Sequence, residues 1–513
     1  MSVAVSAPPV LARAAPGVAA SAAQGGADLS PVPRRSSAWL LPGMLVLATA
    51  VRVVGLTRFP LEQDELYTVM ESRDLFHTAL QPGIEARPLY YLMQHALFWV
   101  FPATPLTLRA LPLLFGLLGV AVTWYLAERV AGRVGAVVAA LLVGLSPWHM
   151  YASGFARYYA LVYLLDAAAV LLLLRAYERD RPADYLAALG VLAAGMATHP
   201  TFAFPLVGAV LGLHLVRPDG RWGWRWPSRR AWGGLWLPFA ALLVVGYVAL
   251  SVAGTRGHAW NFHGRGTLAS LRLVPAMVDW MTLPVAATAV LGAVVLAARP
   301  ATTAERRAGA MMVLGCGGAL LLLVALSFRT DVYADYGMGM LPLVFVASGA
   351  LVARITERFQ PAGAAATAAA AALWIVLLLP STVSELSTGT RFDYRPAFRQ
   401  IRAQAPGVTV LTWPIVEQRQ YAPELRALDL MRVAGRVDAV LAVERDLWVV
   451  ASAQRYGIVG DAGGRLTDWL HTRCALRGSF ERPRFDYRTY RVELYRCRSD
   501  EGVREQPVGA LPR

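Results

Sequence analysis

The sequence contains no lysine, so all 49 of its basic residues other than histidine are arginines. An arginine excess of this kind is typical of a GC-rich bacterial genome. Charged residues make up only 16 % of the 513 residues and 56 % are hydrophobic, which excludes an ordinary soluble protein. The net charge of +15 does not indicate a nucleic-acid partner, because the arginines lie in short clusters between apolar runs and not on one basic domain.

Further absences narrow the class of protein. No apolar stretch closely follows Arg13, and no small-residue cleavage site follows the first apolar run, so we expect an uncleaved first helix and no signal peptide. Residues 1–38 are rich in Ala, Pro, Ser and Gly and lack an apolar core, which predicts a disordered cytoplasmic segment. The sequence has no Asp-x-Asp pair of the kind that holds a metal in nucleotide-sugar enzymes, and its scattered histidines do not indicate zinc.

Apolar runs long enough to cross a bilayer, about 20 residues each, recur along residues 39–384. The predicted spans are 39–56, 106–127, 133–150, 158–176, 184–199, 201–216, 231–254, 274–298, 308–328, 336–353 and 364–381. The sequence therefore predicts a polytopic α-helical membrane protein with about 11 spans and at most 13. A long loop, residues 57–105, separates the first two spans. The glycines at 315–318 and 337–339 lie in apolar helices and indicate close helix packing.

The loop contains one shorter apolar stretch, Leu89 to Phe101, which Gln94 and His95 interrupt. This stretch is predicted to lie on the membrane surface, and the alternative is that it spans the membrane. With a surface helix, the loops assigned to the cytoplasm carry fifteen arginines and the opposite loops five, over the same region. Because positive charge stays inside, this topology is favoured, and it places the long loop and the C-terminus outside the cytoplasm.

From about Phe392 the pattern becomes that of a soluble domain, and we predict a small extracytoplasmic α/β domain over residues 385–498 with a loose tail at 499–513. Residues 408–413 and 447–451 resemble buried strands, 464–472 a helix, and 474–481 and 488–497 a hairpin. Cys474 and Cys497 lie at the two ends of this hairpin, so a structural disulfide is expected, with two buried free thiols as the alternative. Cys316, inside an apolar helix, is expected to serve packing.

Several polar residues are predicted to meet at the outer face. Asp64 and Glu65 follow the first span, Arg109 begins the second, and Arg157 follows the third. Carboxylates act as bases or hold metals, and an arginine can bind a phosphate through paired N–H groups. This face therefore carries a predicted active site. The other residues expected there are Glu85, Arg87, Tyr90, Tyr158 and His199.

The order and spacing of these motifs resemble the family 39 glycosyltransferases. The residues that carry the resemblance are the Asp64-Glu65 loop, Arg87-Pro-Leu-Tyr-Tyr, Leu-Arg109-Ala-Leu-Pro, and Ser-Pro followed by Ala-Arg157-Tyr-Tyr-Ala-Leu. These are GT-C fold enzymes related to protein O-mannosyltransferases and to the aminoarabinose transferases that modify lipid A. The likeness covers about residues 40–220 with these motifs, and the plan of spans followed by an outer domain covers the remainder.

The resemblance implies transfer of a sugar from a polyprenyl-phosphate donor to an acceptor on the outer face, with inversion at the anomeric carbon. By position in the motif, Asp64 is the expected general base, and Glu65 orients the acceptor, supports Asp64 or binds a divalent cation that some relatives use. Arg87, Arg109 and Arg157 are expected to bind the donor phosphate. Two neighbouring carboxylates raise the pKa of one another, which suits one of them to act as a base.

The sequence departs from the family pattern beside Arg87. Many relatives have two prolines after the basic residue, whereas Leu89 follows Pro88 here. The acidic residue that often precedes the basic one is displaced to Glu85 by Ala86. The resemblance therefore leaves open whether Glu65 and Glu85 hold a metal, and it names no certain cofactor.

The resulting prediction is an enzyme of the bacterial cytoplasmic membrane whose partners are the bilayer, a polyprenyl-phosphate sugar and a lipid, glycan or protein acceptor. The alternative class is a transporter or a lipid flippase of envelope precursors. Transporters usually show paired repeats and broken helices around a midplane site, whereas here the polar residues gather at one face. A non-catalytic scaffold for envelope assembly is a third interpretation.

Overall fold

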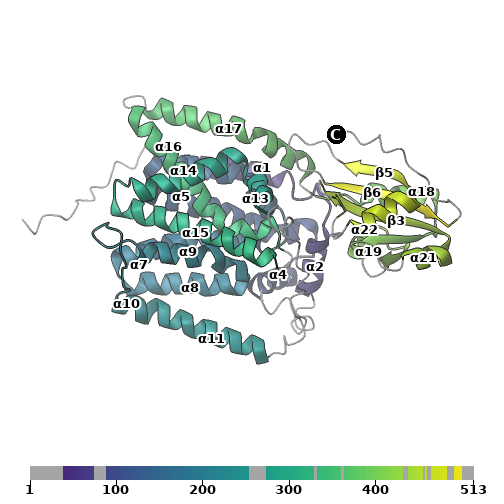
Figure 1. Ribbon diagram of the computed structural model, residues 1–513, viewed down its shortest axis with the longest axis horizontal. Coiled ribbons are helices and arrows are strands. Elements are labelled where there is room, and N and C mark those ends of the chain that lie inside the picture. Colours follow the sequence, from purple (N-terminus) through teal and green to yellow (C-terminus); the bar gives the residue numbers. More distant parts are fainter. Residues whose placement is uncertain are drawn as a thin grey trace, which may run out of the picture. The chain divides into compact units, whose positions relative to one another are not determined.

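The computed structural model describes residues 39–73, 88–252, 273–328, 332–359, 363–389, 391–430, 437–454, 457–458, 464–481 and 490–499. Residues Leu41–Arg513 form one compact unit, with a helical part followed in the chain by a sheet domain (Figure 1). The helical part consists of α1 (Leu40–Val53), α2 (Gln63–Arg73), α4 (Pro88–Val100), α5 (Pro105–Leu145), α6 (Pro147–Ser153), α7 (Tyr159–Arg179), α8 (Pro182–Thr198), η2 (Pro200–Phe202), α9 (Ala203–His214), α10 (Arg229–Ala231), η3 (Trp232–Trp236), α11 (Leu237–Val252), α13 (Leu273–Met281), α14 (Leu283–Ala298), α15 (Thr303–Ser327), η5 (Ala334–Met340), α16 (Leu341–Thr356), η6 (Glu357–Phe359) and α17 (Gly363–Thr388).

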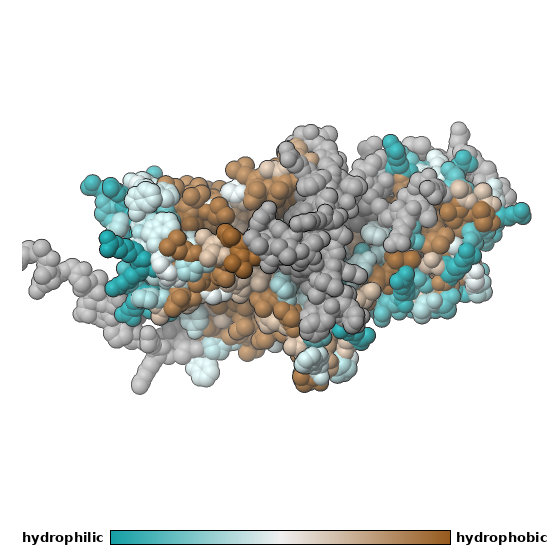
Figure 2. Space-filling view, turned by 90° about the horizontal axis from the view of Figure 1, so that it is seen from below, coloured by the Kyte–Doolittle hydropathy of each residue, from teal (hydrophilic) through white to brown (hydrophobic). Residues whose placement is uncertain are grey.

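In the part of the chain that the structure describes, five helices are long and apolar enough to cross a membrane. They are α5, α7, α15, the continuous η5–α16 and most of α17. The pair α13–α14, bent by 96°, would be a sixth span, and α1, α8 and η2–α9 are shorter apolar helices. Each of the predicted apolar runs falls on helix. Figure 2 shows that much of the visible surface of the helical part is hydrophobic, as expected for a surface that faces lipid.

Helix α5 contains two of the predicted spans, 106–127 and 133–150, which meet at a break. Ala131 and Gly132 have non-helical backbone angles, and Gly132 has a φ of +66°. A Cβ on Gly116 would lie against Ser153, and one on Gly119 would lie against His149 and Tyr163. The first half of α5 therefore packs against the segment that follows its second half, so the chain reverses direction at the break. This reversal agrees with two separate apolar helical runs, and the crossing of the membrane by each of them stays a prediction.

The start of the next helix is fixed by capping. Ser146 accepts a hydrogen bond from the backbone N–H of His149, and Pro147 occupies the first turn of α6. A proline there suits a helix start because its missing N–H would have had no partner. Helix α6 ends at Gly154 after seven residues. The short loop that follows leads to Arg157 and then into α7.

Helix α4 coincides with the apolar stretch that we expect on the membrane surface. Tyr90, Tyr91 and Gln94 are buried, while Trp99 and Val100 are 79 % and 73 % exposed. Thirteen residues extend about 20 Å as a helix, which is short of the roughly 30 Å hydrocarbon core. One side of α4 packs on α2 and α8.

The sheet domain contains a mixed sheet of order β2-β1-β3-β6-β5, with β4 paired to β3. Its elements are α18 (Arg395–Gln404), β1 (Thr409–Trp413), α19 (Ile415–Tyr421), β2 (Arg426–Asp429), α21 (Val437–Glu444), β3 (Asp446–Gln454), β4 (Gly457–Ile458), α22 (Arg465–Arg473), β5 (Cys474–Glu481) and β6 (Arg491–Arg498). Strands β1, β2 and β3 are parallel neighbours, and β3, β6 and β5 are antiparallel. The predicted α/β class is confirmed.

Alternation along β3 explains how both faces of this sheet are covered. Leu447 and Val449 pack with residues of α21 and α22, whereas Trp448 and Val450 pack with residues of α18. Cys474 pairs in register with Cys497 across β5 and β6, and the two cysteines form a disulfide.

Candidate active site

Asp64 and Glu65 occupy the first turn of α2, where negative side chains complement the helix dipole. Consecutive residues of a helix point about 100° apart, so these two carboxylates enter different surroundings. The Asp64 side chain is 43 % exposed, whereas the Glu65 side chain is completely buried. The pair recognised in the sequence therefore separates into an accessible acid and an enclosed one.

Glu65 is the centre of a buried hydrogen-bond network. Its Oε1 accepts from Nε of Arg109 (2.7 Å) and from the backbone N–H of Ala156 (3.0 Å). Its Oε2 accepts from Nη2 of Arg109 (2.6 Å), Nη1 of Arg391 (2.7 Å) and the backbone N–H of Glu62 (3.2 Å). Both oxygens are fully occupied, so a metal ion at Glu65 would have to displace these donors.

Arg109 uses every N–H group that a guanidinium has. Besides the two bonds to Glu65, Nη1 donates to the carbonyls of Leu56 (2.8 Å) and Phe59 (3.1 Å), and Nη2 donates to the carbonyl of Pro60 (2.8 Å). A guanidinium has five N–H donors, and these five bonds account for all of them. The side chain is fully buried. No donor of Arg109 is left for a phosphate, so the structure favours a role in holding the loop between α1 and α2.

Arg391 enters this network from the segment between α17 and the sheet domain. Besides its bond to Glu65, its Nη2 donates to the carbonyl of Gly154 (2.5 Å). The next residue, Phe392, donates its backbone N–H to Oε1 of Glu62 (3.0 Å). One short segment thus ties α2, the loop after α6 and the start of the sheet domain together.

The charges in this network shift the titration of its carboxyl groups. Burial alone would raise the pKa of Glu65, but Arg391 and Arg109 together with the hydrogen bonds hold it below its ordinary value. Burial raises the pKa of Glu62 to about 8, against the opposing effect of Arg391. Burial and the neighbouring Glu62 and Glu65 also raise the pKa of Glu417 in α19. Glu65 is therefore the member of the group in which the neighbouring charges and hydrogen bonds favour the ionised form.

Arg157 is the arginine that faces Asp64. Its Nε lies 3.6 Å from Oδ2 of Asp64, and its Nη1 donates to the hydroxyl of Tyr91 (2.8 Å). The Nε–H is buried and has no hydrogen-bond partner among the residues that the structure describes. Burial would lower the pKa of Arg157, but Asp64 and the tyrosines around it raise it, so the group is charged. Asp64 and Arg157 thus form an ion pair at the predicted site, in which the acid is accessible and the arginine is buried.

The aromatic candidates extend this site away from Asp64. The ring of Tyr158 lies 5.5 Å from the Arg157 guanidinium and stacks on His199 with 4.2 Å between ring centroids. Nδ1 of His199 is within 2.7 Å of the hydroxyl of Thr201. Tyr90 is buried beside Tyr91, and its hydroxyl has no partner within the described ranges. The structure thus brings Asp64, Arg157, Tyr158 and His199 together.

Two predicted residues, Glu85 and Arg87, lie outside the described residues. Among those that are described, no group of three or more His, Cys, Asp or Glu side chains has the arrangement of a metal site. The metal role suggested for Glu65 and Glu85 stays a prediction.

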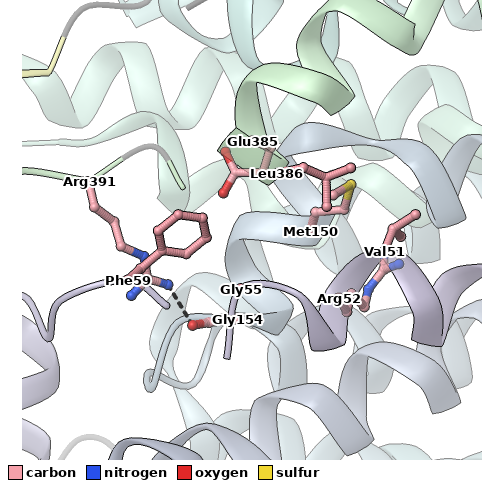
Figure 3. A pocket seen from close by; sticks show the side chains of 9 residues that line it. All are labelled: Val51, Arg52, Gly55, Phe59, Met150, Gly154, Glu385, Leu386 and Arg391. Atoms are coloured by element: carbon pink, nitrogen blue, oxygen red, sulfur yellow. Dashed lines mark hydrogen bonds between the residues drawn. The ribbon is translucent and has the colours of Figure 1, made fainter. Parts of the chain in front are cut away.

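A small cavity adjoins the network (Figure 3). It has a volume of about 20 Å³, which suits about one water molecule. Arg391 and Arg52 line it from opposite sides, and Glu385 of α17 closes it from a third side. Arg52 of α1 donates to the carbonyls of Val143 and Gly144 and lies 2.8 Å from Nδ1 of His149. Arg52 is thus paired with polar groups inside the helical part.

Sequence reasoning missed Glu62, Arg391 and Glu417. Arg391 lies 326 residues after its partner Glu65, and no motif links the two positions. Glu62 is part of the acidic segment Glu62-Gln-Asp-Glu65, which is the one signal that could have found it. Glu417 belongs to a short helix that the sequence pattern does not reveal.

Comparison with known proteins places these residues in a family context. The model of the dolichyl-phosphate-mannose-protein mannosyltransferase family matches residues 82–247, which include Arg109 and Arg157. This match supports the resemblance inferred from the motifs. A comparison with curated proteins finds no match.

Solved structures share the fold at low sequence identity. ArnT from Cupriavidus metallidurans in the apo state has a TM-score of 0.52 and 14 % identity, over 88 % of this chain and 97 % of that chain. The same protein bound to undecaprenyl phosphate has a TM-score of 0.51 and 13 % identity, over 92 % of this chain and 100 % of that chain. The Archaeoglobus fulgidus oligosaccharyltransferase in complex with zinc and sulfate has a TM-score of 0.50 and 12 % identity, over 88 % of this chain and 72 % of that chain. The predicted GT-C fold is confirmed by these similarities.

Proposed function

We propose that this chain, whose family match and fold indicate a membrane glycosyltransferase of the GT-C type, transfers a sugar from a polyprenyl-phosphate donor to an acceptor on the outer face of the bacterial cytoplasmic membrane. The transfer inverts the anomeric carbon, and Asp64 is the general base. The observation that carries the proposal is the contrast within α2. Asp64 is accessible and pairs with Arg157, while its neighbour Glu65 is enclosed by two arginines.

Asp64 suits a base because its carboxylate is exposed at the start of a helix that is anchored on its other side. An attacking hydroxyl or amine must lose a proton as its bond to carbon forms, and a carboxylate within hydrogen-bond reach accepts that proton. The Glu65 network fixes the backbone of α2 at the adjacent position. Asp64 is therefore held in place without being occupied by these partners.

Arg157 is the described residue best suited to the donor phosphate. Its buried Nε–H has no hydrogen-bond acceptor in the described part of the chain, and Tyr91 and Tyr158 hold its side chain. A guanidinium stabilises the negative charge that develops on a leaving phosphate. The fold relative ArnT has been solved with undecaprenyl phosphate bound, which supports a polyprenyl phosphate as the leaving group. Arg87 remains a second phosphate ligand in this proposal.

The proposed reaction is a single displacement. The acceptor oxygen or nitrogen forms a bond to the anomeric carbon as its proton passes to Asp64, and the bond from that carbon to the phosphate oxygen breaks. The polyprenyl phosphate leaves with the bonding electrons, and Arg157 faces its charge. Glu65, Arg109 and Arg391 act through the position of α2 and of the loop before Arg157, and Tyr158 and His199 line the side away from Asp64. The acceptor is a lipid, a glycan or a protein.

The test compares the envelope lipids, glycans and glycoproteins of a deletion strain by mass spectrometry. The strain is complemented with wild type, with Asp64→Asn, or with Glu424→Gln, which changes an exposed carboxylate of the sheet domain. Wild type and Glu424→Gln are expected to restore a hexose- or pentose-sized modification, and Asp64→Asn to lose it by about 100-fold or more at equal protein level. Equal restoration by Asp64→Asn would remove Asp64 as the base and favour a transporter or a scaffold.

A further inference from the structure

A cluster of arginines lies at the end of the helical part that is remote from Asp64. Helix α7 begins beside Arg157 and ends at Arg179, so its two ends are about 30 Å apart. Near the far end, Nη2 of Arg225 donates to the carbonyl of Tyr177 (2.9 Å), and its guanidinium lies 5.0 Å from the Tyr177 ring. The cluster is therefore separate from the glycosyl-transfer site.

Two arginines of this cluster contact one turn of the chain, residues 217–220, and the third, Arg225, follows this turn in the sequence. Arg306 donates to the carbonyl of Gly220, and Arg307 donates to the carbonyl of Arg217 (3.4 Å). Arg225 and Arg307 lie close enough for their charges to interact. Arg307 is only 7 % exposed. Several positive charges are thus gathered in a small, partly dry volume.

This cluster contains unsatisfied N–H groups. Nη1 of Arg225, Nε of Arg306 and Nε of Arg307 are buried and have no hydrogen-bond partner among the described residues. No carboxylate of the described ranges lies within 4 Å of these three guanidinium groups. Buried N–H groups of a charged side chain that lack an acceptor are unfavourable, so these groups favour an anion beside them.

Other arginines at the same end show that carboxylates were available to pair with. Arg129 pairs with Glu178, Arg175 with Asp184, Arg230 with Asp180 and Arg354 with Glu305. Glu305 lies directly before Arg306 in the sequence, yet it pairs with Arg354 of α16. The cluster of Arg225, Arg306 and Arg307 is left with excess positive charge after these pairs have formed.

Exposed tryptophans adjoin the cluster on the same loop. Trp222, Trp224 and Trp226 are 53 %, 44 % and 74 % exposed, and Trp224 stacks on His214 with 5.5 Å between ring centroids. Exposed indoles in a membrane protein gather at the level of the lipid headgroups. Both the rings and the guanidinium groups are therefore expected at the level of a headgroup phosphate and its glycerol.

We propose that Arg225, Arg306 and Arg307 form a binding site for the phosphate of one anionic glycerophospholipid, with the tryptophans of residues 222–226 beside its glycerol and upper acyl chains. Guanidinium groups bind a phosphate through charge-assisted, paired N–H bonds. An anionic lipid is the occupant that fits, because it brings both a net negative charge for the arginines and apolar chains for the indoles. The site is independent of the sugar that the enzyme transfers.

Native mass spectrometry of the purified full chain in neutral detergent tests this proposal. The protein is titrated with phosphatidylglycerol, with phosphatidylcholine, or with phosphatidylglycerol in the presence of inorganic phosphate. Wild type is expected to retain one phosphatidylglycerol at least about tenfold more strongly than phosphatidylcholine. Inorganic phosphate at the same concentration is expected not to displace it. Displacement by free phosphate would indicate a simple anion site and overturn the lipid assignment.

The matched variants remove two charges each from the same end of the molecule. Arg225→Gln with Arg307→Gln should weaken phosphatidylglycerol retention by about tenfold, while Arg229→Gln with Arg230→Gln, two exposed residues, should leave it near wild type. An equal loss of phosphatidylglycerol retention in both double variants would show a general effect of positive charge and would contradict a specific binding site. Arg307→Lys keeps the positive charge but loses the paired N–H donors of the guanidinium, so it should retain phosphatidylglycerol only in part. This single variant tests the site if the double variant fails to fold.

Discussion

At the scale of single residues, two neighbouring acids have opposite environments. Asp64 faces Arg157 with its carboxylate partly in solvent, and Glu65 is enclosed by Arg109, Arg391 and a backbone amide. Helical geometry alone separates them, because adjacent side chains diverge by about 100°. We therefore expect substitution of Asp64 to lower turnover and substitution of Glu65 to lower stability.

Glu65→Gln is expected to destabilise the protein strongly. The variant leaves the buried charges of Arg109 and Arg391 without their carboxylate, a change that costs about 3–5 kcal/mol. Thermal unfolding of the detergent-purified protein measures this loss. Asp64→Asn is the adjacent control, and as a partly exposed change it should shift stability by no more than about 0.5 kcal/mol. A larger loss in Asp64→Asn than in Glu65→Gln would contradict the assignment of Glu65 as the structural member.

The raised pKa of Glu62 leads us to expect that the free energy of unfolding depends on pH. Its pKa rises from 4.5 to about 8 in the folded protein, so between these values the folded chain keeps a proton that the unfolded chain has released. Stability is therefore lost as the pH rises through this window. Arg391 opposes the shift, and Glu65 and Asp64 add to it.

Glu62→Gln removes this titration but keeps an acceptor for the Phe392 amide. Its thermal stability relative to wild type should grow as the pH increases toward about 8 and then level off. Unfolding temperatures of both proteins over this range provide the measurement, and parallel curves would show that Glu62 does not carry the effect. Glu417, whose pKa is also raised, remains in both proteins.

At the residue scale the sequence predicts local chemistry better than distant pairing. The Asp64-Glu65 loop, Arg109 and Arg157 were recognised from motifs, and the structure brings all four close together. Arg391 could not be found in this way, since its contact with Glu65 spans 326 residues. The sequence also could not show that all five N–H groups of Arg109 are occupied. Three of their acceptors are backbone carbonyls, which every residue has and which no motif marks.

At the scale of elements, glycines set how closely the apolar helices approach. A Cβ on Gly208 of α9 would lie 2.0 Å from the carbonyl oxygen of Leu314 in α15, and one on Gly212 would lie 2.5 Å from that of Ala310. The two glycines are four residues apart on one face, the spacing at which small residues let helix backbones meet. The contact of α9 with α15 therefore leaves no room for a side chain.

Gly208→Ala should accordingly destabilise the helical part. The added methyl meets backbone and not a flexible side chain, so α9 and α15 must move apart at a cost of about 1–3 kcal/mol. Gly317→Ala on α15 is the matched control, because nothing lies within 4 Å of its Cβ position. In thermal unfolding in detergent, Gly208→Ala should unfold at a lower temperature than Gly317→Ala. Equal unfolding temperatures would show that the close contact of α9 with α15 does not determine stability.

The elements themselves were largely predictable where the pattern was long. Apolar runs gave the helical regions, and the hairpin 474–481 and 488–497 corresponds to β5 and β6. The short elements β2, β4 and α19 escaped prediction, because four, two and seven residues carry too little periodicity. The predicted spans 106–127 and 133–150 fall on either side of the break at Ala131 and Gly132 in α5.

At the scale of the whole molecule, the sheet domain contacts the loop that precedes α2, the helix of Asp64. The hydroxyl of Tyr421 lies 2.7 Å from the backbone nitrogen of Leu61 and 2.9 Å from its carbonyl oxygen. Arg391 and Phe392 join the same loop just before the domain begins. Removing residues from 385 onward would therefore remove Arg391 as well, and loss of activity in such a truncation would say nothing about acceptor choice.

Arg391→Met tests this coupling without removing the domain. It should lower the turnover of sugar transfer by about tenfold or more, because Glu65 and the Gly154 carbonyl lose a shared anchor next to Asp64 and Arg157. Arg391→Lys should recover part of the activity. Arg395→Met, which removes a half-exposed arginine paired with Asp393, is the control and should retain turnover. Equal turnover in Arg391→Met and wild type would refute the coupling.

The Glu65 network also has a consequence for the order of synthesis. Glu65 emerges from the ribosome 326 residues before Arg391. At about 5–20 residues per second, roughly 15 to 65 seconds separate the two. During this interval Arg109 is the only one of the two arginines available to Glu65, and the Phe392 amide that Glu62 accepts from does not yet exist. The Glu65 network beside Asp64 can therefore be completed only after the last apolar helix has been made.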